Sequence, residues 1–306
     1  MARRKRRERP GPAGFLIVDK PVGVTSHDVV DRARRWLGTR RVGHLGTLDP
    51  QATGVLPLAV RAATKLVPYV MDTNKGYVGV VALGAETDTL DAEGRVLRRH
   101  DGPLPGAPEV EAALGPFRGE IEQIPPMYSA VKKDGVPLHK LARKGEEVER
   151  EPKKVRIDVL DLLQFQDGEF EIRVDCSAGT YVRTLAADLG TALGCGAHLK
   201  SLRRVRSGPF TSADAATVEV LEEASAERRV DEAIVAPDGA LGLARLKVSE
   251  EGERRILHGA DISAGTVLRL AVGDRVVAFD TQDRLLAILE LRPDRRLWPL
   301  RVLQTD

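Results

Sequence analysis

The first sixty residues alternate short apolar runs with one amphipathic segment. The apolar run in "GFLIVDK" at 14–20 indicates a buried strand, and "GVLPLAV" at 54–60 indicates a second. Between them, apolar side chains in "HDVVDRARRWLG" recur at helical spacing, which predicts a helix with one buried face. Ser26 is the expected N-cap of this helix, and Gly38 suits the position just past its end.

The middle of the chain mixes strand and helix patterns in an irregular order. An apolar strand is predicted for "GYVGVVALG" at 76–84 and a short helix for "EVEAALGPF" at 109–117. Two paired strands are predicted for "VRIDVLDLLQF" and "EFEIRVDC", a helix for "GTYVRTLAADLGTALG", and a basic strand for "HLKSLRRVRSG". This order favours the α+β class, with a mixed or antiparallel sheet flanked by helices, over repeating βαβ units.

The pattern changes again after the acidic, helix-like segment that precedes residue 240. "TVLRLAV", "RVVAFD" and "RLLAILEL" are short strand patterns separated by Gly or Asp. We therefore expect a large domain over 14–240 and a small all-β domain over 243–306. Within the large domain, the segment 125–153 is punctuated by prolines and carries basic and acidic patches, and a connection this long is usually functional or mobile rather than part of the core.

Composition places the chain among ordinary globular proteins, and a net charge of +2 says little about partners. Cys176 and Cys195 are the only cysteines, which argues against a disulfide framework or a structural zinc site. No run approaches the ~18 apolar residues of a membrane span, and the basic start lacks the apolar core of a signal peptide, so we expect a cytoplasmic protein. Residues 1–13 are expected to form a basic flexible arm, either a solvated tail or a contact for phosphates.

The segment "GHLGTLDPQATG" at 43–54 places His44 and Asp49 in a stretch that is too irregular for a helix or strand. Its glycines match neither common phosphate-binding pattern, and a loop gives no register that would aim both side chains at a metal. An Asp-Pro pair ordinarily starts a turn, and this interpretation of Asp49 stays open. The alternative is catalytic, because a carboxylate held between a basic helix and a buried strand can act as nucleophile or base without a cofactor.

The same segment resembles the signature of the TruB family of pseudouridine synthases, G-H-x-G-x-L-D-P-x-A-T-G-x-L. "DKPVGVTSHDVV" is similar to the family's K-P-x-G-x-[ST]-S segment, and "KGYVGVVALG" followed by "TDTLDAEG" is similar to the strand that carries its active-site tyrosine. "FRGEIEQIPPMYSAVK", "CSAGTYVRTLAADLG" and "LGCGAHLKSLRRVRSGPF" resemble further motifs. The resemblance runs in order through residues 14–210, and several motifs at compatible spacing argue against chance.

The resemblance implies an enzyme that isomerises uridine to pseudouridine at position 55 in the T loop of tRNA, with no cofactor and no metal. The target base must be flipped out of the stack for this chemistry. By the resemblance, Asp49 is the catalytic carboxylate, Arg183 pairs with it, and Tyr77 stacks on the target base. The further substrate contacts that it implies are His44, Lys20, Tyr181 and Leu202. A loop-shaping role for His44 and a solvated turn role for Lys20 remain the alternatives.

The resemblance also identifies the insertion at 125–153 with the family's RNA-gripping thumb loop, in which Lys132, Lys133 and Arg143 would meet phosphates. The domain at 243–306 is similar to PUA-type RNA-binding domains in position, size and strand pattern. The implied partner is the tRNA T stem-loop, with a monomer and no obligate protein partner. Two alternatives stay open: a non-catalytic RNA-binding or tRNA-folding protein, and a guide-RNA-dependent dyskerin-type synthase. The compact length and the insertion favour the stand-alone enzyme.

Overall fold

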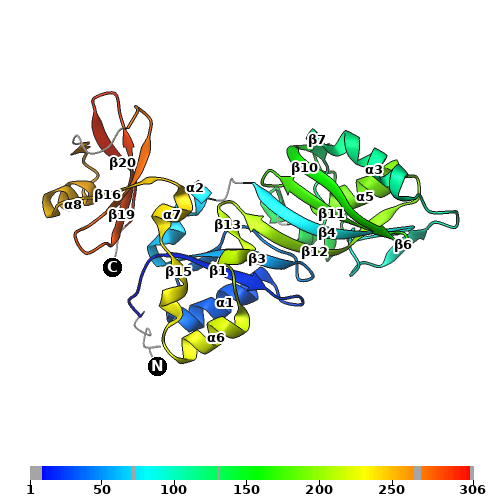
Figure 1. Cartoon of the computed structure of the whole chain (residues 1–306), viewed down its shortest axis with the longest axis horizontal. Helices are drawn as coiled ribbons and strands as arrows, with labels where there is room; N and C mark the ends of the chain where they lie inside the picture. The colour runs from blue at the N-terminus through cyan, green and yellow to red at the C-terminus, as the bar shows by residue number, and fades with distance from the viewer. Residues whose placement is uncertain (1–8, 71–73, 130, 265–269, 304–306) are drawn as a thin grey trace. The chain divides into compact units, whose positions relative to one another are not determined.

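The computed structural model describes residues 9–70, 74–129, 131–264 and 270–303 and is drawn in Figure 1. The chain divides into two compact units, each built from segments that are distant in sequence. The first unit comprises 1–49, 55–71 and 209–306, and the second comprises 50–54 and 72–208. Both units contain helices and strands in irregular order, which confirms the α+β class.

In the first unit, strand β1 lies between β14 and β3 in the large sheet. β1 pairs in parallel with β14 and antiparallel with β15, and β2 pairs antiparallel with β3. Helices α1 and α6 contact each other (Figure 1). The elements up to residue 241 are β1 (Gly14–Lys20), α1 (Ser26–Leu37), β2 (Val42–His44), β3 (Thr53–Val60), η1 (Arg61–Leu66), α2 (Val67–Val70), β13 (Phe210–Thr211), η3 (Ser212–Asp214), β14 (Ala216–Thr217), α6 (Val218–Ala226), η4 (Val230–Ala233), β15 (Ile234–Val235) and α7 (Pro237–Leu241).

Helix α1 forms where the apolar spacing predicts it, but its N-cap differs from the prediction. Thr25 is the N-cap: its hydroxyl accepts from the Asp28 N–H at 3.1 Å, and the Asp28 carboxylate accepts from the Thr25 N–H at 2.9 Å. This reciprocal capping box satisfies two N–H groups at the helix start. Ser26 is instead the first helical residue, and its side chain is buried. At the other end, Gly38 adopts the left-handed conformation, with φ 60°, as expected.

The second unit is built on the antiparallel strand order β12–β4–β11–β10–β7. Helix α3 packs on β10, α5 packs on β12, and the two helices contact each other (Figure 1). The insertion at 125–153 contributes a small hairpin and a short helix. The elements are β4 (Lys75–Leu83), β5 (Ala85–Thr87), β6 (Val96–Arg99), α3 (Ala107–Leu114), η2 (Gly115–Phe117), β7 (Gly119–Gln123), β8 (Lys132–Lys133), β9 (Val136–Pro137), α4 (Leu138–Ala142), β10 (Lys153–Gln166), β11 (Glu169–Cys176), α5 (Val182–Ala192) and β12 (Ala197–Ser207).

The C-terminal part of the first unit is a small β-rich domain with the strand order β16–β18–β19–β20–β17. The expected β domain is present, and it also contains a helix that the sequence pattern did not indicate. Only Ile256 of this helix is buried, so the segment offers too few apolar positions to reveal a helical period. The elements are β16 (Ala244–Lys247), α8 (Glu250–Leu257), β17 (Ile262–Ser263), β18 (Arg275–Phe279), β19 (Leu285–Leu291) and β20 (Arg296–Val302).

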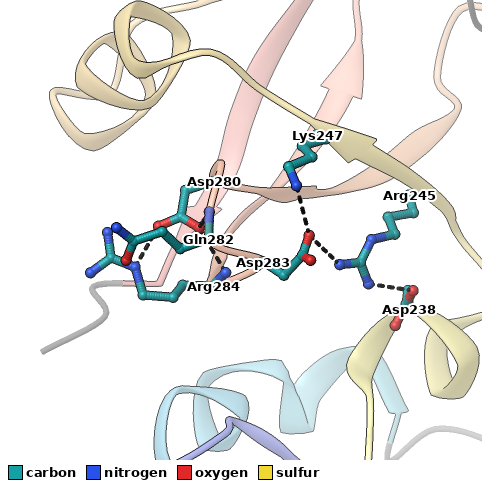
Figure 2. Close-up of polar contacts among 7 residues, drawn as sticks. All are labelled: Asp238, Arg245, Lys247, Asp280, Gln282, Asp283 and Arg284. Atoms are coloured by element: carbon teal, nitrogen blue, oxygen red, sulfur yellow. Dashed lines mark hydrogen bonds and ion pairs between the residues drawn. The ribbon is translucent and has the colours of Figure 1, made fainter.

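Charged side chains tie this β-rich domain to α7, as Figure 2 shows. Arg245 on β16 donates to Asp238 at 3.0 Å and to Asp283 at 2.9 Å, and its guanidinium lies 3.8 Å from the centre of the Phe279 ring. The carboxylate of Asp280 accepts two main-chain N–H groups of the β18–β19 turn, each at 2.8 Å. One arginine therefore links the helix, the first strand of the domain and this turn.

The structure describes both cysteines and the last part of the basic N-terminal arm. Both cysteines are buried free thiols, and burial raises the pKa of Cys176 to about 11. Of the expected basic arm, residues 1–8 lie outside the described part of the chain. Arg9 forms an ion pair with Asp231 at 2.5 Å, and its N–H donates to the Gly38 carbonyl at 3.0 Å.

Within the described ranges, no helix is long and apolar enough to cross a membrane.

Candidate active site

The loop that carries Asp49 is anchored by its apolar residues. His44 is the last residue of β2, and the Leu45 N–H donates to the Pro57 carbonyl of β3 at 2.9 Å. The side chains of Leu45 and Leu48 are buried, whereas Asp49 is half-buried. The loop is therefore irregular in backbone but fixed at its apolar positions, which flank the half-buried Asp49.

Two predicted substrate contacts of the first unit are held by neighbouring main chain. Lys20 is fully buried, and its Nζ donates to the carbonyls of Pro21 at 2.9 Å and Val24 at 2.7 Å. Its ammonium group therefore supports the turn between β1 and α1, so a solvated turn lysine is the wrong description. The His44 Nδ1 atom accepts from the Gly46 N–H at 3.4 Å. That contact fits the loop-shaping role left open by the sequence.

Tyr77 lies on β4 directly opposite Arg204 on β12. Both side chains are buried, with exposed fractions of 8% for Tyr77 and 1% for Arg204. Burial lowers the pKa of the Arg204 guanidinium, while its hydrogen bond with the Tyr77 side chain acts in the opposite direction. Buried Arg204 on the adjacent strand therefore fixes Tyr77. Arg204 was not among the residues singled out from the sequence.

Arg183, near the start of α5, is held by three oxygen atoms of two loops. Its Nη1 donates to the Thr89 carbonyl at 3.1 Å and to the Asp91 carboxylate at 3.3 Å, and its Nη2 donates to the Tyr128 carbonyl at 2.9 Å. Only 7% of the arginine side chain is exposed. Asp91 is thus a carboxylate partner that the sequence analysis missed, and the pairing of Arg183 with Asp49 stays a prediction.

The two remaining predicted site residues, Tyr181 and Leu202, have hydrogen-bonded main chains. Buried Gln123 binds both main-chain polar groups of Tyr181: its Oε1 accepts from the Tyr181 N–H at 3.0 Å, and its Nε2 donates to the Tyr181 carbonyl at 3.3 Å. Leu202 on β12 accepts a hydrogen bond at its carbonyl from the Thr53 hydroxyl at 3.5 Å. A Cβ at Gly79 would lie 3.2 Å from Leu202 Cδ1, so this glycine leaves room for the leucine side chain.

The insertion holds part of its basic charge in internal contacts. Leu138 is buried and anchors the short helix α4. Lys133 Nζ donates to the Glu149 carbonyl at 2.7 Å, which leaves the ammonium exposed but fixed. Arg143 is exposed, and the side chain of Lys132 lies outside the described residues.

The predicted site residues divide between the two units. In the second unit, the structure places two of them on the adjacent strands β4 and β12 and two at the start of α5. Among the described ranges, no group of three or more His, Cys, Asp or Glu side chains is arranged to hold a metal ion. The first unit carries Lys20, His44 and Asp49, and the second carries Tyr77, Tyr181, Arg183 and Leu202.

Comparison with known proteins identifies the class. Residues 34–182 match the model of the TruB family pseudouridylate synthase N-terminal domain, and residues 183–241 match the tRNA pseudouridylate synthase B C-terminal domain. The chain is 44% identical over 304 residues to "tRNA pseudouridine synthase B" of Pseudomonas aeruginosa, which covers 98% of this chain and 99% of the relative. It is 45% identical over 296 residues to the protein of the same name from Ectopseudomonas mendocina, which covers 95% of both chains.

Solved structures agree with this class. A chain from the crystal structure of a Cbf5-Nop10-Gar1 complex matches with a TM-score of 0.69 and 27% identity, covering 95% of this chain and 85% of the other. A chain from an H/ACA RNP bound to a substrate RNA containing 2'-deoxyuridine matches with a TM-score of 0.69 and 25% identity, over the same shares. The fold and the matched motifs define a pseudouridine-forming isomerase. The chain belongs to the TruB family of pseudouridine synthases.

Proposed function

We propose that this enzyme converts uridine to pseudouridine at position 55 in the T loop of tRNA, with Asp49 as the catalytic carboxylate. The observation that carries the proposal is the placement of Asp49: it lies within the family match and directly follows a buried, anchored residue of the loop. A rigidly held carboxylate beside a flipped base is what nucleophilic or proton-abstracting chemistry at the ribose requires. The relatives named tRNA pseudouridine synthase B support tRNA as the substrate.

The reaction is an isomerisation and therefore balances without a co-reactant. The bond between C1′ of the ribose and N1 of uracil breaks, the base turns, and a bond forms between C1′ and C5. The proton on C5 is released, and N1 gains a proton. The Asp49 carboxylate supports the cleavage at C1′.

The second unit supplies the groups that would hold the flipped base. Tyr77 is fixed by buried Arg204, so its ring can stack on uracil with little loss of side-chain entropy. Arg183 is held by three oxygen atoms, so its guanidinium is preorganised to stabilise an ionised carboxylate. In this proposal, Arg183 pairs with Asp49 while it retains the loop contacts described above.

The insertion and the β-rich domain would bind the rest of the T arm. Exposed Arg143 and Lys133 are the candidate phosphate contacts of the insertion. The five-stranded domain serves as a PUA-like RNA-binding domain in this proposal. We also propose a cytoplasmic monomer that needs no obligate protein partner, whereas the solved Cbf5 relatives are described in complexes. Light scattering on the purified protein tests the oligomeric state.

A pseudouridine assay on unmodified tRNA tests the proposal. Purified wild type and Asp49→Asn are compared with a chelator present, and a tRNA with cytidine at position 55 serves as the matched substrate control. We expect pseudouridine at position 55 from wild type alone, with tRNA binding by both proteins. Product from Asp49→Asn would remove the carboxylate from the reaction. Binding without product from wild type would favour a non-catalytic RNA-binding protein or a guide-RNA-dependent synthase.

A further inference from the structure

One buried hydroxyl holds the main chain directly before Asp49. Ser26, the first residue of α1, has an exposed fraction of 2%. Its Oγ donates to the Leu48 carbonyl at 3.0 Å and accepts from the Leu48 N–H at 2.8 Å. A single side chain therefore satisfies both main-chain polar groups of the residue that precedes the candidate catalytic carboxylate.

This contact is not needed to cap the helix. Thr25 caps α1 through its reciprocal bonds with Asp28, so the Ser26 hydroxyl is left for a partner outside the helix. Hydroxyls at helix starts ordinarily bond to nearby N–H groups of their own helix. A buried serine that instead binds a loop 22 residues later indicates a role in that loop.

Leu48 is also held by the burial of its side chain, in addition to the Ser26 hydroxyl. Its side chain is buried, with an exposed fraction of 3%, so side chain, N–H and carbonyl are all fixed. The peptide after the fixed Leu48 carbonyl is planar, so only φ and the side-chain torsions of Asp49 remain to place its carboxylate. On the other side, Lys20 holds the Val24 carbonyl at 2.7 Å and thereby supports the turn that leads into Ser26.

We infer that Ser26 is a positioning residue for Asp49. Its two hydrogen bonds to Leu48 set where the carboxylate meets the ribose. The segment around 20–26 therefore fixes the loop at 43–54 through these two hydrogen bonds. This inference rests on the proposed function, since it takes Asp49 as the catalytic carboxylate.

Replacing Ser26 by alanine tests the inference. The Ser26→Ala variant loses both bonds, so we expect single-turnover pseudouridine formation at saturating enzyme to slow on the order of 100-fold, the scale of a misplaced reactive group. The dissociation constant for tRNA should stay within about threefold, because no RNA contact is removed. The Ser26→Cys variant keeps a weakly polar side chain of similar size and should lose roughly tenfold in rate. It also carries the test if the alanine variant does not fold.

Thr25→Ala is the matched control. It weakens the same helix at the adjacent position but leaves the bonds between Ser26 and Leu48 in place. We expect a lower melting temperature because the helix loses its cap, and a rate within about twofold of wild type because the Ser26 bonds remain. The control thereby separates stability from positioning. Equal rate losses in Thr25→Ala and Ser26→Ala would overturn the inference, because helix stability alone would explain both.

Asp49→Asn, measured in parallel, separates this inference from the proposed function. If Asp49→Asn still turns over, the proposed catalytic role fails, and the inference fails with it. If Asp49→Asn is inactive while Ser26→Ala and Ser26→Cys both turn over at the wild-type rate, only the positioning role of Ser26 is overturned. An inactive Asp49→Asn with slow Ser26 variants and unchanged tRNA affinity supports both.

Discussion

Substituting alanine for Gly54 should destabilise the protein strongly. Gly54 is the second residue of β3 and has φ 100°, a conformation that residues with a Cβ rarely adopt. It pairs in parallel with Arg204. A Cβ at this position would lie 2.2 Å from the Arg204 carbonyl oxygen and 3.0 Å from its carbonyl carbon and nitrogen. These are backbone atoms of a paired strand, so they cannot move aside as a flexible side chain would.

The cost of Gly54→Ala has two parts. The unfavourable backbone conformation costs about 1–3 kcal/mol. Displacing the packed strand around the new methyl group costs about a further 1–3 kcal/mol. The sum of about 2–6 kcal/mol is a large fraction of the ~5–15 kcal/mol by which proteins are ordinarily stable. At about 2–4 °C per kcal/mol, the melting temperature should fall by at least about 4 °C.

Thermal and guanidinium denaturation, followed by circular dichroism, measure this effect. Gly43→Ala is the matched control, because Gly43 lies in β2, the antiparallel partner of β3, and a Cβ there meets nothing within 4 Å. We expect the control to change the free energy of unfolding by less than about 0.5 kcal/mol. If Gly54→Ala were as stable as Gly43→Ala, the close approach of β3 and β12 at this position would be wrong. The turnover of Gly54→Ala should also fall, because Arg204 contacts Tyr77.

Three further predictions concern charged groups. Asp91→Ala removes one ion-pair contact of the buried Arg183 guanidinium and should lower the free energy of unfolding by about 2 kcal/mol in urea denaturation; a loss below about 0.5 kcal/mol would contradict the described pair. Partial burial of Asp175 raises its pKa, but hydrogen bonds from two arginines outweigh burial and lower the pKa overall. The Asp175 carboxylate therefore stabilises the fold above its unfolded pKa of about 3.9, and this contribution is lost as pH falls through the lower folded pKa. Asp175→Asn should flatten the dependence of the free energy of unfolding on pH in acid, and an unchanged slope would refute this. Arg143→Gln should reduce the slope of log affinity for tRNA against log salt by roughly 0.7–0.9, and an identical slope would remove Arg143 from the RNA contact.

The sequence predicted the elements whose pattern is strongly periodic. The helix predicted from "HDVVDRARRWLG" is α1, and the strand expected at 76–84 is Lys75–Leu83. The N-cap was wrong, because Thr25 and Ser26 both carry a hydroxyl and propensity alone does not say which one turns outward. Helix α8 was missed, since its face toward the core buries one residue.

The candidate site was only partly accessible to sequence reasoning. The loop with Asp49 could be found by its motif, but the groups that hold the site residues are distant in sequence. Gln123 binds Tyr181 across 58 positions, and Asp91 binds Arg183 across 92. Such pairs depend on strand register and loop paths, which a single sequence does not specify. A buried Gln or Arg also carries no periodic signal of its own.

The buried thiols have a practical consequence for labelling experiments. Cys176 is fully buried with a pKa of about 11, and burial also raises the pKa of Cys195. At pH 7, only on the order of one Cys176 thiol in ten thousand is ionised, so maleimide dyes should leave this residue unmodified in the folded protein. A single cysteine introduced at exposed Arg143 should therefore accept a fluorophore selectively. The native cysteines can stay in place while the fluorescence of this dye reports tRNA binding near the insertion.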